Sequence, residues 1–327
     1  MTAPILMPIT VPTGEIAVRG PFDLAASCRY LASYGPAARP DAASEPGVLR
    51  LAFPVDGEWT HVGAAIRQRS PGTLEVEVFG PVELAARVMT QVSRVLCVDV
   101  DASGLPDVDR RDSVAARLRA ESPGLRPVLF SSPYEAACWS VLSQGMRFTS
   151  ALKRRRVLAE SHGRIVDVGE YQVVSFPAPE ALAELSSAEG LAGFRVARLR
   201  SVAQAALDGR LDPVELRTLP IPDALAHLSA ISGIGTFSAE QILLRGAGHP
   251  DLFPRADARL HHAMCEEYAL PPGTPTPQLA LLADDWRPYR SWLVQLLRAT
   301  RDAVPPAPET PPSATAPLSE VAGVVPV

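Results

Sequence analysis

The chain has 327 residues, of which 47% are hydrophobic, and this is enough for about two globular domains with ordinary cores. Its 31 basic and 36 acidic residues give a net charge of −5, so any contact with nucleic acid must come from a local cluster of cations. The N-terminus lacks a secretory leader pattern and no apolar run is long enough to span a bilayer. We therefore expect a cytoplasmic protein with reduced cysteines and no membrane partner.

Residues 1–104 are expected to form a small α+β domain. Strand-like runs of alternating apolar and polar residues occur at 48–53 and 73–78. Two helix candidates accompany them. We expect Pro21 and Pro81 to open these helices, because proline is tolerated in a first turn.

Residues 105–302 are expected to form an all-α domain. Ser132 and Glu135 have the spacing of a capping box, with Pro133 at the first helical position between them. Gly and Pro punctuation separates the predicted helices, which cover 135–161, 179–188, 194–208, 223–231, 236–245 and 258–268. Residues 303–327 are rich in Pro, Ala, Thr and Ser and are expected to be a disordered tail.

The most informative segment covers residues 228–257, where an apolar helix end, a glycine turn and a second helix precede a lone carboxylate. Gly233 and Gly235 can take positive φ angles and, lacking Cβ atoms, allow close approach of a phosphate backbone. The amides at the start of the helix near Thr236 would face that phosphate. On the glycines alone, a plain two-helix hairpin is the alternative interpretation.

The pattern Leu-x-x-Ile-x-Gly-Ile-Gly-x-x-x-Ala, which starts at Leu228 and precedes an aspartate after Phe-Pro, resembles the helix-hairpin-helix DNA glycosylase superfamily. Within it, the chain is similar to the 3-methyladenine DNA glycosylase II type. Further similar segments occur in the family's order at 132–144, 174–182 and 286–292, so the resemblance covers about residues 95–300. It implies a half-TATA-binding-protein-like N-terminal domain followed by a helical glycosylase domain with its hairpin at about 225–246.

The resemblance assigns the catalytic role to Asp257. Removing a base from deoxyribose builds positive charge on the sugar, which a fixed carboxylate stabilises, and the same carboxylate can orient or deprotonate water. Asp257 also precedes a predicted helix, so an N-cap is the structural alternative. Asp251 is the competing carboxylate, but it lies before the Phe-Pro step.

The resemblance also implies which residues contact DNA and the flipped base. The expected DNA-binding residues are Gly233, Ile234, Gly235, Thr236 and Ser238. The expected base-pocket or wedge residues are Gln144, Met146, Phe237, Gln241, Trp286 and Arg298.

The sequence departs from the family's pattern in this region. Gly145 stands where the best-studied type has a bulky wedge, so Met146 is either a substitute wedge or ordinary helix core. Gln241 and Arg298 replace aromatic residues that stack on the base. Trp286, with the nearby Tyr289 and Trp292, could supply stacking or could pack in the core.

Lys153 is the only lysine among the 31 basic residues, so the other 30 are arginines, which cannot form a Schiff base. In the lyase members of the superfamily a lysine follows the hairpin glycines, and here Phe237 takes that place. No lyase activity is therefore expected. Lys153 lies in a run of cations and is interpreted as a backbone contact or a solvated side chain.

No cofactor and no metal are expected. The cysteines at 28, 97, 138 and 265 stand singly, and His261 with Cys265 provides only two ligands at helical spacing. The expected partner is double-stranded DNA with damaged bases, bound by a monomer at the nucleoid.

The expected function is monofunctional excision of alkylated purines of the 3-methyladenine type, leaving an abasic site. The alternative is a DNA-damage-binding relative with weak or no catalysis, or a glycosylase for an unusual adduct.

Overall fold

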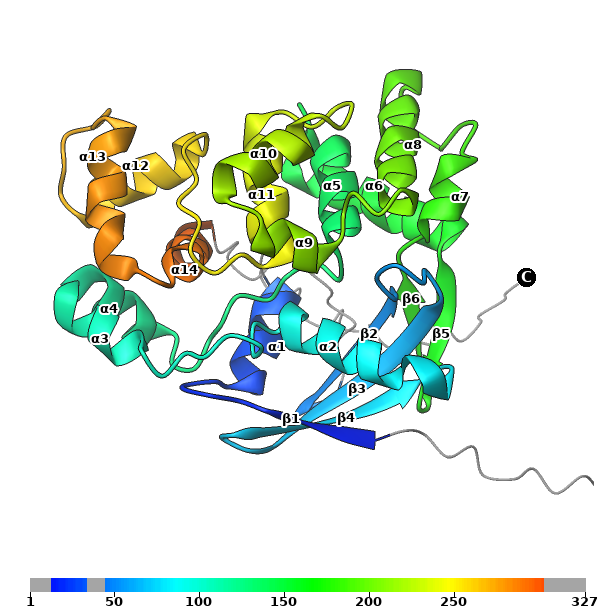
Figure 1. Cartoon of the computed structure of the whole chain (residues 1–327), viewed down its shortest axis with the longest axis horizontal. Coiled ribbons are helices and arrows are strands. Elements are labelled where there is room, and N and C mark those ends of the chain that lie inside the picture. Colours follow the sequence, from blue (N-terminus) through cyan, green and yellow to red (C-terminus); the bar gives the residue numbers. More distant parts are fainter. Residues whose placement is uncertain (1–12, 34–44, 303–327) are drawn as a thin grey trace, which may run out of the picture.

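The computed structural model describes residues 13–33 and 45–302, so the tail expected at 303–327 lies outside the described residues. A four-stranded antiparallel sheet has the order β1 (Thr13–Ala17), β4 (Thr73–Phe79), β3 (His61–Ser70), β2 (Val48–Pro54). Helices α1 (Leu24–Ser33) and α2 (Ala85–Val95) accompany the sheet (Figure 1). The expected α+β N-terminal part is present, and the strands predicted at 48–53 and 73–78 are confirmed.

The prolines expected to open helices lie differently from the prediction. Helix α1 begins at Leu24, three residues after Pro21. Pro81 precedes a short 3₁₀ helix, Val82–Leu84, which leads into α2. Both prolines therefore mark the approach to a helix and not its first α-helical turn.

A hairpin of β5 (Arg164–Val168) and β6 (Tyr171–Ser175) packs against β2 and β3. It buries a small cluster with Val48 and Ala52, while Leu49, Leu51 and Phe53 of β2 belong to the main core. The edge strand β2 is therefore buried on both faces. The sequence prediction missed this hairpin.

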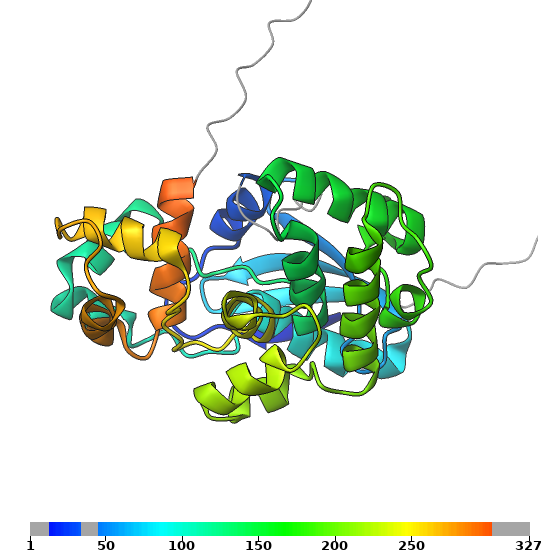
Figure 2. The ribbon, with the colours of Figure 1, turned by 90° about the horizontal axis from the view of Figure 1, so that it is seen from above.

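The remainder is helical (Figure 1), and its elements fall into two groups. One group contains α3 (Leu105–Arg111), α4 (Ser113–Glu121), α12 (Ala258–Glu267), α13 (Thr276–Leu282) and α14 (Arg290–Asp302), with a 3₁₀ turn at Ala283–Trp286. The other contains α5 (Pro133–Ser143), α6 (Phe148–His162), α7 (Pro179–Ala183), α8 (Gly193–Leu207), α9 (Pro213–Thr218), α10 (Ile221–Ser229) and α11 (Thr236–Ile242), which continues as a π-helix over Leu243–Ala247. Figure 2 shows α11 between the two groups.

The single helix expected over 135–161 is wrong, because the chain breaks between α5 and α6. Gly145 lies in this break with φ of +62°, a left-handed conformation that suits glycine and interrupts a helix. Gly163 ends α6, and a Cβ there would lie 2.1 Å from the carbonyl oxygen of Ser175. These glycines allow the helix break and the tight return into the β5–β6 hairpin.

The capping box at α5 is half confirmed. Ser132 Oγ accepts the N–H of Glu135 at 2.9 Å, as the motif predicts. The Glu135 carboxylate instead accepts the N–H of Ser131 at 3.1 Å and forms an ion pair with Arg155. Glu135 is thereby a buried anchor between α5 and α6.

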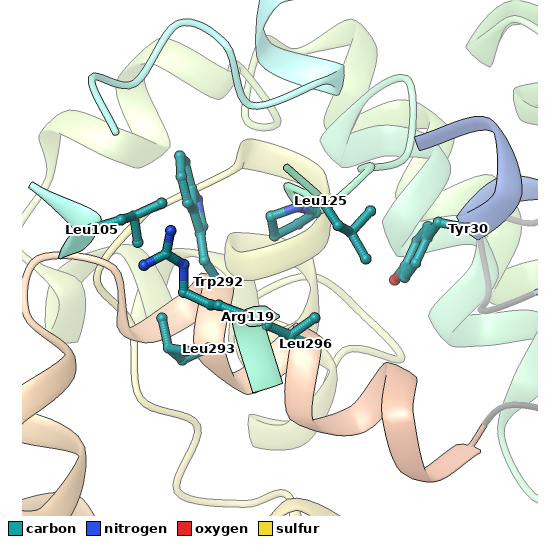
Figure 3. A pocket seen from close by; sticks show the side chains of 8 residues that line it. Tyr30, Leu105, Arg119, Leu125, Trp292, Leu293 and Leu296 are labelled. Atoms are coloured by element: carbon teal, nitrogen blue, oxygen red, sulfur yellow. The ribbon is translucent and has the colours of Figure 1, made fainter. Parts of the chain in front are cut away.

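A small cavity lies beside α14, where residues of α1, α3 and α4 face this helix (Figure 3). Its volume is about 20 Å³, and its lining includes Tyr30, Leu105, Arg119, Leu125, Trp292, Leu293 and Leu296. A cavity of this size holds about one water molecule, so it is too small for a base.

In the described part of the chain, no helix is both long and apolar enough to cross a membrane.

Candidate active site

The turn between α10 and α11 is the glycine hairpin that the sequence predicts. Gly233 has φ of +92°, and a Cβ there would lie 2.7 Å from Cδ of Arg198. Gly235 has φ of −93° and ψ of 179°, so the expectation of a positive φ at this glycine is wrong. A Cβ on Gly235 would meet nothing within 4 Å, and this glycine therefore leaves an open surface rather than a strained turn.

The other predicted hairpin residues differ in exposure. Ile234 is buried and anchors the turn, whereas Thr236 is exposed and Ser238 is buried. No side chain among the described residues caps the N-terminus of α11. The first amides of α11 thus lack a side-chain acceptor at the surface where Gly235 is open, which suits an external anion.

Gln144 joins the end of α5 to the hairpin. Its Nε2 donates to the carbonyl of Gly233 at 2.7 Å, and its Oε1 accepts from Nη1 of Arg198 at 2.8 Å. Arg195 donates to the carbonyls of Val141, at 2.8 Å, and Gln144. Gln144 is therefore a support for the turn.

Three exposed phenylalanines lie on elements around this support, and sequence reasoning identified only Phe237. Phe237 is 49% exposed, Phe194 is 54% exposed and Phe148 is 40% exposed. The Phe194 ring centroid is 5.2 and 5.3 Å from the guanidinium carbons of Arg195 and Arg198. The signal available in the sequence was an aromatic residue directly before this pair of arginines. Met146 lies in the break between α5 and α6 and is half-buried against the core, so it is not part of a helix.

Asp257 caps α12 and also forms an ion pair. Its Oδ1 accepts the N–H of Leu260 at 3.1 Å and Nη1 of Arg298 at 3.0 Å. Asp257 is only 4% exposed. The structural and the catalytic interpretations of this residue are therefore compatible, and Arg298 is placed directly at the candidate carboxylate.

Asp251 is engaged elsewhere. Its carboxylate accepts from Arg290 at 2.8 and 2.9 Å and from Arg287 at 3.0 Å. These contacts fix the loop after the π-helix to the start of α14. Asp251 is thus a structural ion-pair partner.

Trp286 is not placed to stack on a base, which corrects the prediction. It is 1% exposed, and its Nε1 donates to Asp112 Oδ2 at 2.8 Å and lies 3.1 Å from the Tyr268 hydroxyl. Tyr289 and Trp292 are each 4% exposed. Burial of the tryptophan N–H needs such partners, and these were not recognisable from sequence spacing.

Gln241 follows Phe237 by one turn of α11, on the same side of the helix. Its Oε1 accepts from Nε of Arg245 at 2.9 Å. Sequence reasoning missed a third residue of this helix, Glu240, which accepts the N–H groups of Arg255 and Ala256 just before Asp257.

A cleft of about 500 Å³ lies between α2 and α9. Its lining includes Gln91, Arg94 and Arg217, and neither Asp257 nor a hairpin residue contributes.

His261, one of the two possible metal ligands at helical spacing, contacts the carbonyl of Pro254 at 3.1 Å. The described residues contain no group of three side chains suited to hold a metal.

No protein-family model and no curated protein matches the sequence. Solved structures do match. A 3-methyladenine DNA glycosylase from Archaeoglobus fulgidus is 19% identical with a TM-score of 0.72, covering 88% of this chain and 98% of that one. An 8-oxoguanine glycosylase/lyase from Clostridium acetobutylicum is 18% identical with a TM-score of 0.59, covering 84% and 91%. These similarities establish that the chain has the fold of helix-hairpin-helix DNA glycosylases.

Proposed function

We propose that this chain, with its helix-hairpin-helix glycosylase fold, is a monofunctional DNA glycosylase that removes alkylated purines from duplex DNA. The observation that carries the proposal is the placement of Asp257. This carboxylate is fixed at the start of α12 by Leu260 and Arg298, in the element that follows the hairpin and its connecting loop.

Hydrolysis of the glycosidic bond is favoured by a negative charge beside the sugar. As the glycosidic bond breaks, positive charge develops at the anomeric carbon, and the fixed Asp257 carboxylate stabilises it in a site from which water is largely excluded. An alkylated purine already carries positive charge, so it leaves without a general acid. Asp257 can then orient the attacking water.

DNA would lie across the open hairpin surface. The amides of Thr236 and its neighbours would bind a phosphate beside Gly235. Two exposed cations, Arg147 at the start of α6 and Lys153 on it, supply local positive charge on a chain with net charge −5, whereas Arg156 is paired with Glu160.

A second candidate, a DNA-damage-binding protein with weak catalysis, is favoured by the surroundings of Asp257. Arg298 neutralises part of the Asp257 charge, and the carboxylate is almost fully buried. Such a protein would keep the hairpin contacts and bind damaged duplexes without releasing a base. Formation of alkali-labile sites in a methylated duplex distinguishes the two candidates.

Gly235→Val should weaken binding to every duplex, damaged or not, by about tenfold, because its side chain would stand where a phosphate approaches. Valine fits the backbone angles at this position, so folding should be retained. Fluorescence anisotropy at several salt concentrations measures the loss of affinity. Gly209, at another turn, is unsuitable as a control position because its φ is +76°. Gly72→Val, at the turn between β3 and β4, is the matched control, because this glycine has no positive φ and an added Cβ would meet nothing closer than 3.7 Å. Equal affinity of Gly235→Val and wild type would contradict the phosphate assignment.

The product strand should stay intact until hot alkali is added, and borohydride should trap no covalent protein–DNA adduct. Phe237 occupies the place at which a lyase lysine is expected, and Lys153 is exposed on α6. Denaturing gel electrophoresis with and without alkali measures strand cleavage. An adduct that disappears in Lys153→Ala would show a lyase and contradict this assignment.

A further inference from the structure

Glu240 lies on α11 beneath the turn that leads into Asp257. It is 2% exposed. Its Oε1 accepts the N–H of Arg255 at 2.8 Å, and its Oε2 accepts the N–H of Ala256 at 2.9 Å. Both acceptor atoms of one side chain therefore hold the N–H groups of the two residues before Asp257.

The same turn is held from α12. His261 Nε2 lies 3.1 Å from the carbonyl oxygen of Pro254, and the His261 ring stacks on Phe253 with centroids 6.0 Å apart. Asp257 itself is fixed by Leu260 and by Arg298 of α14. Glu240 is the contact that ties this turn to the hairpin helix, so it connects the DNA-binding hairpin to the candidate catalytic carboxylate.

We propose that Glu240, in its ionised form, is a positioning residue that orients Asp257 for base release. This proposal rests on the glycosylase function proposed above. A carboxylate offers one full acceptor oxygen to each of the two N–H donors, whereas a protonated carboxyl or an amide carries a donor at one of these positions, which weakens that contact. Loss of either contact would let the peptide before Asp257 rotate and move its carboxylate away from the sugar.

The surroundings of Glu240 make this role pH-dependent. Burial raises the pKa of Glu240, and the two backbone N–H groups partly oppose that rise. The negative charge of Asp257 raises the pKa further, while His261 lowers it. Arg298 is the cation that faces these two carboxylates, through its ion pair with Asp257. Glu240 should consequently take up a proton at a higher pH than an ordinary glutamate.

The rate and the stability should then change in opposite directions as the pH falls. The rate of base release should fall as the pH drops through the raised pKa, because the protonated side chain holds only one amide. The folded state, in contrast, binds this proton more readily than the unfolded chain does, so protonation of Glu240 favours folding in that window. A role in stability alone would not produce an acid limb in the rate.

The test compares single-turnover release of base, as a function of pH, from a duplex that carries one methylated purine. Glu240→Gln should lower the plateau rate about tenfold, as expected for one lost charge-assisted contact, and should move the acid limb to lower pH. Glu240→Ala should lower the rate further. Binding of both variants to an abasic-site duplex should equal that of wild type, because the phosphate contacts lie elsewhere.

Glu135→Gln is the matched control, since Glu135 is a buried carboxylate that also accepts a backbone N–H but serves α5 and α6. It should keep the wild-type acid limb. Wild-type rates and an unmoved acid limb in Glu240→Gln and Glu240→Ala would overturn the positioning role while leaving the glycosylase function intact. A wild-type protein that releases no base would overturn the glycosylase function and this proposal together.

Discussion

Asp257→Asn is expected to lower the single-turnover rate of base release by about a hundredfold or more. The change removes the negative charge that we place beside the sugar, and losing one preorganised electrostatic partner costs a few kcal/mol in the transition state. Asparagine caps helices nearly as well as aspartate, so the contact to Leu260 can persist. Binding to an abasic-site duplex should be retained, and rapid quenching measures the rate.

The matched control is Asp212→Asn, because Asp212 caps α9 through the N–H groups of Val214 and Glu215 but is exposed and lies outside the candidate site. This variant should release base at the wild-type rate. If Asp257→Asn also does so, Asp257 is a helix cap only and the catalytic assignment is wrong.

Asp112→Ala is expected to lower the free energy of unfolding by about 3 kcal/mol. Asp112 Oδ1 accepts the N–H groups of Val114 and Ala115, at 2.8 and 2.9 Å, and Oδ2 accepts from Trp286 Nε1. Tyr268 donates its hydroxyl proton to the same carboxylate. Removing the acceptor leaves several buried donors unpaired and deletes a helix cap.

Denaturant titration followed by circular dichroism measures this loss, and Asp112→Asn should lose clearly less because it keeps a capping oxygen. A loss below about 1 kcal/mol in Asp112→Ala would contradict the account of Asp112 as the acceptor that allows Trp286 to be buried. The base-release rate per folded molecule should not change in either variant.

The parts of the fold that depend on local pattern could be predicted from the sequence. The hairpin helices, the Ser132 cap and the strands at 48–53 and 73–78 follow from residue spacing, glycine turns and capping chemistry. The place of Asp257 after the hairpin distinguishes it from the other carboxylates in the sequence, and its catalytic role stays a prediction.

The parts that depend on tertiary contacts could not be predicted in the same way. The partners of Trp286 are separated from it by 174 and 18 residues, and Glu240 meets its amides 15 and 16 residues later. The open conformation of Gly235 and the break at Gly145 reflect how the chain packs, because glycine permits several conformations and the sequence does not select one.

The ion pair between Asp257 and Arg298 shows the same limit. In the sequence, Arg298 stands where the family has an aromatic residue of the base pocket. In the structure, its guanidinium forms an ion pair with the candidate carboxylate, Asp257. Its charge lowers the negative potential that Asp257 presents.

The most direct test of the central claim is mass spectrometry of free bases released from duplexes that each carry one alkylated purine, with wild type and Asp257→Asn compared side by side. We expect wild type to release the alkylated base and Asp257→Asn to release it far more slowly while still binding the abasic product. Tight binding of the damaged duplexes by wild type with no released base would contradict it and would favour a damage-binding protein.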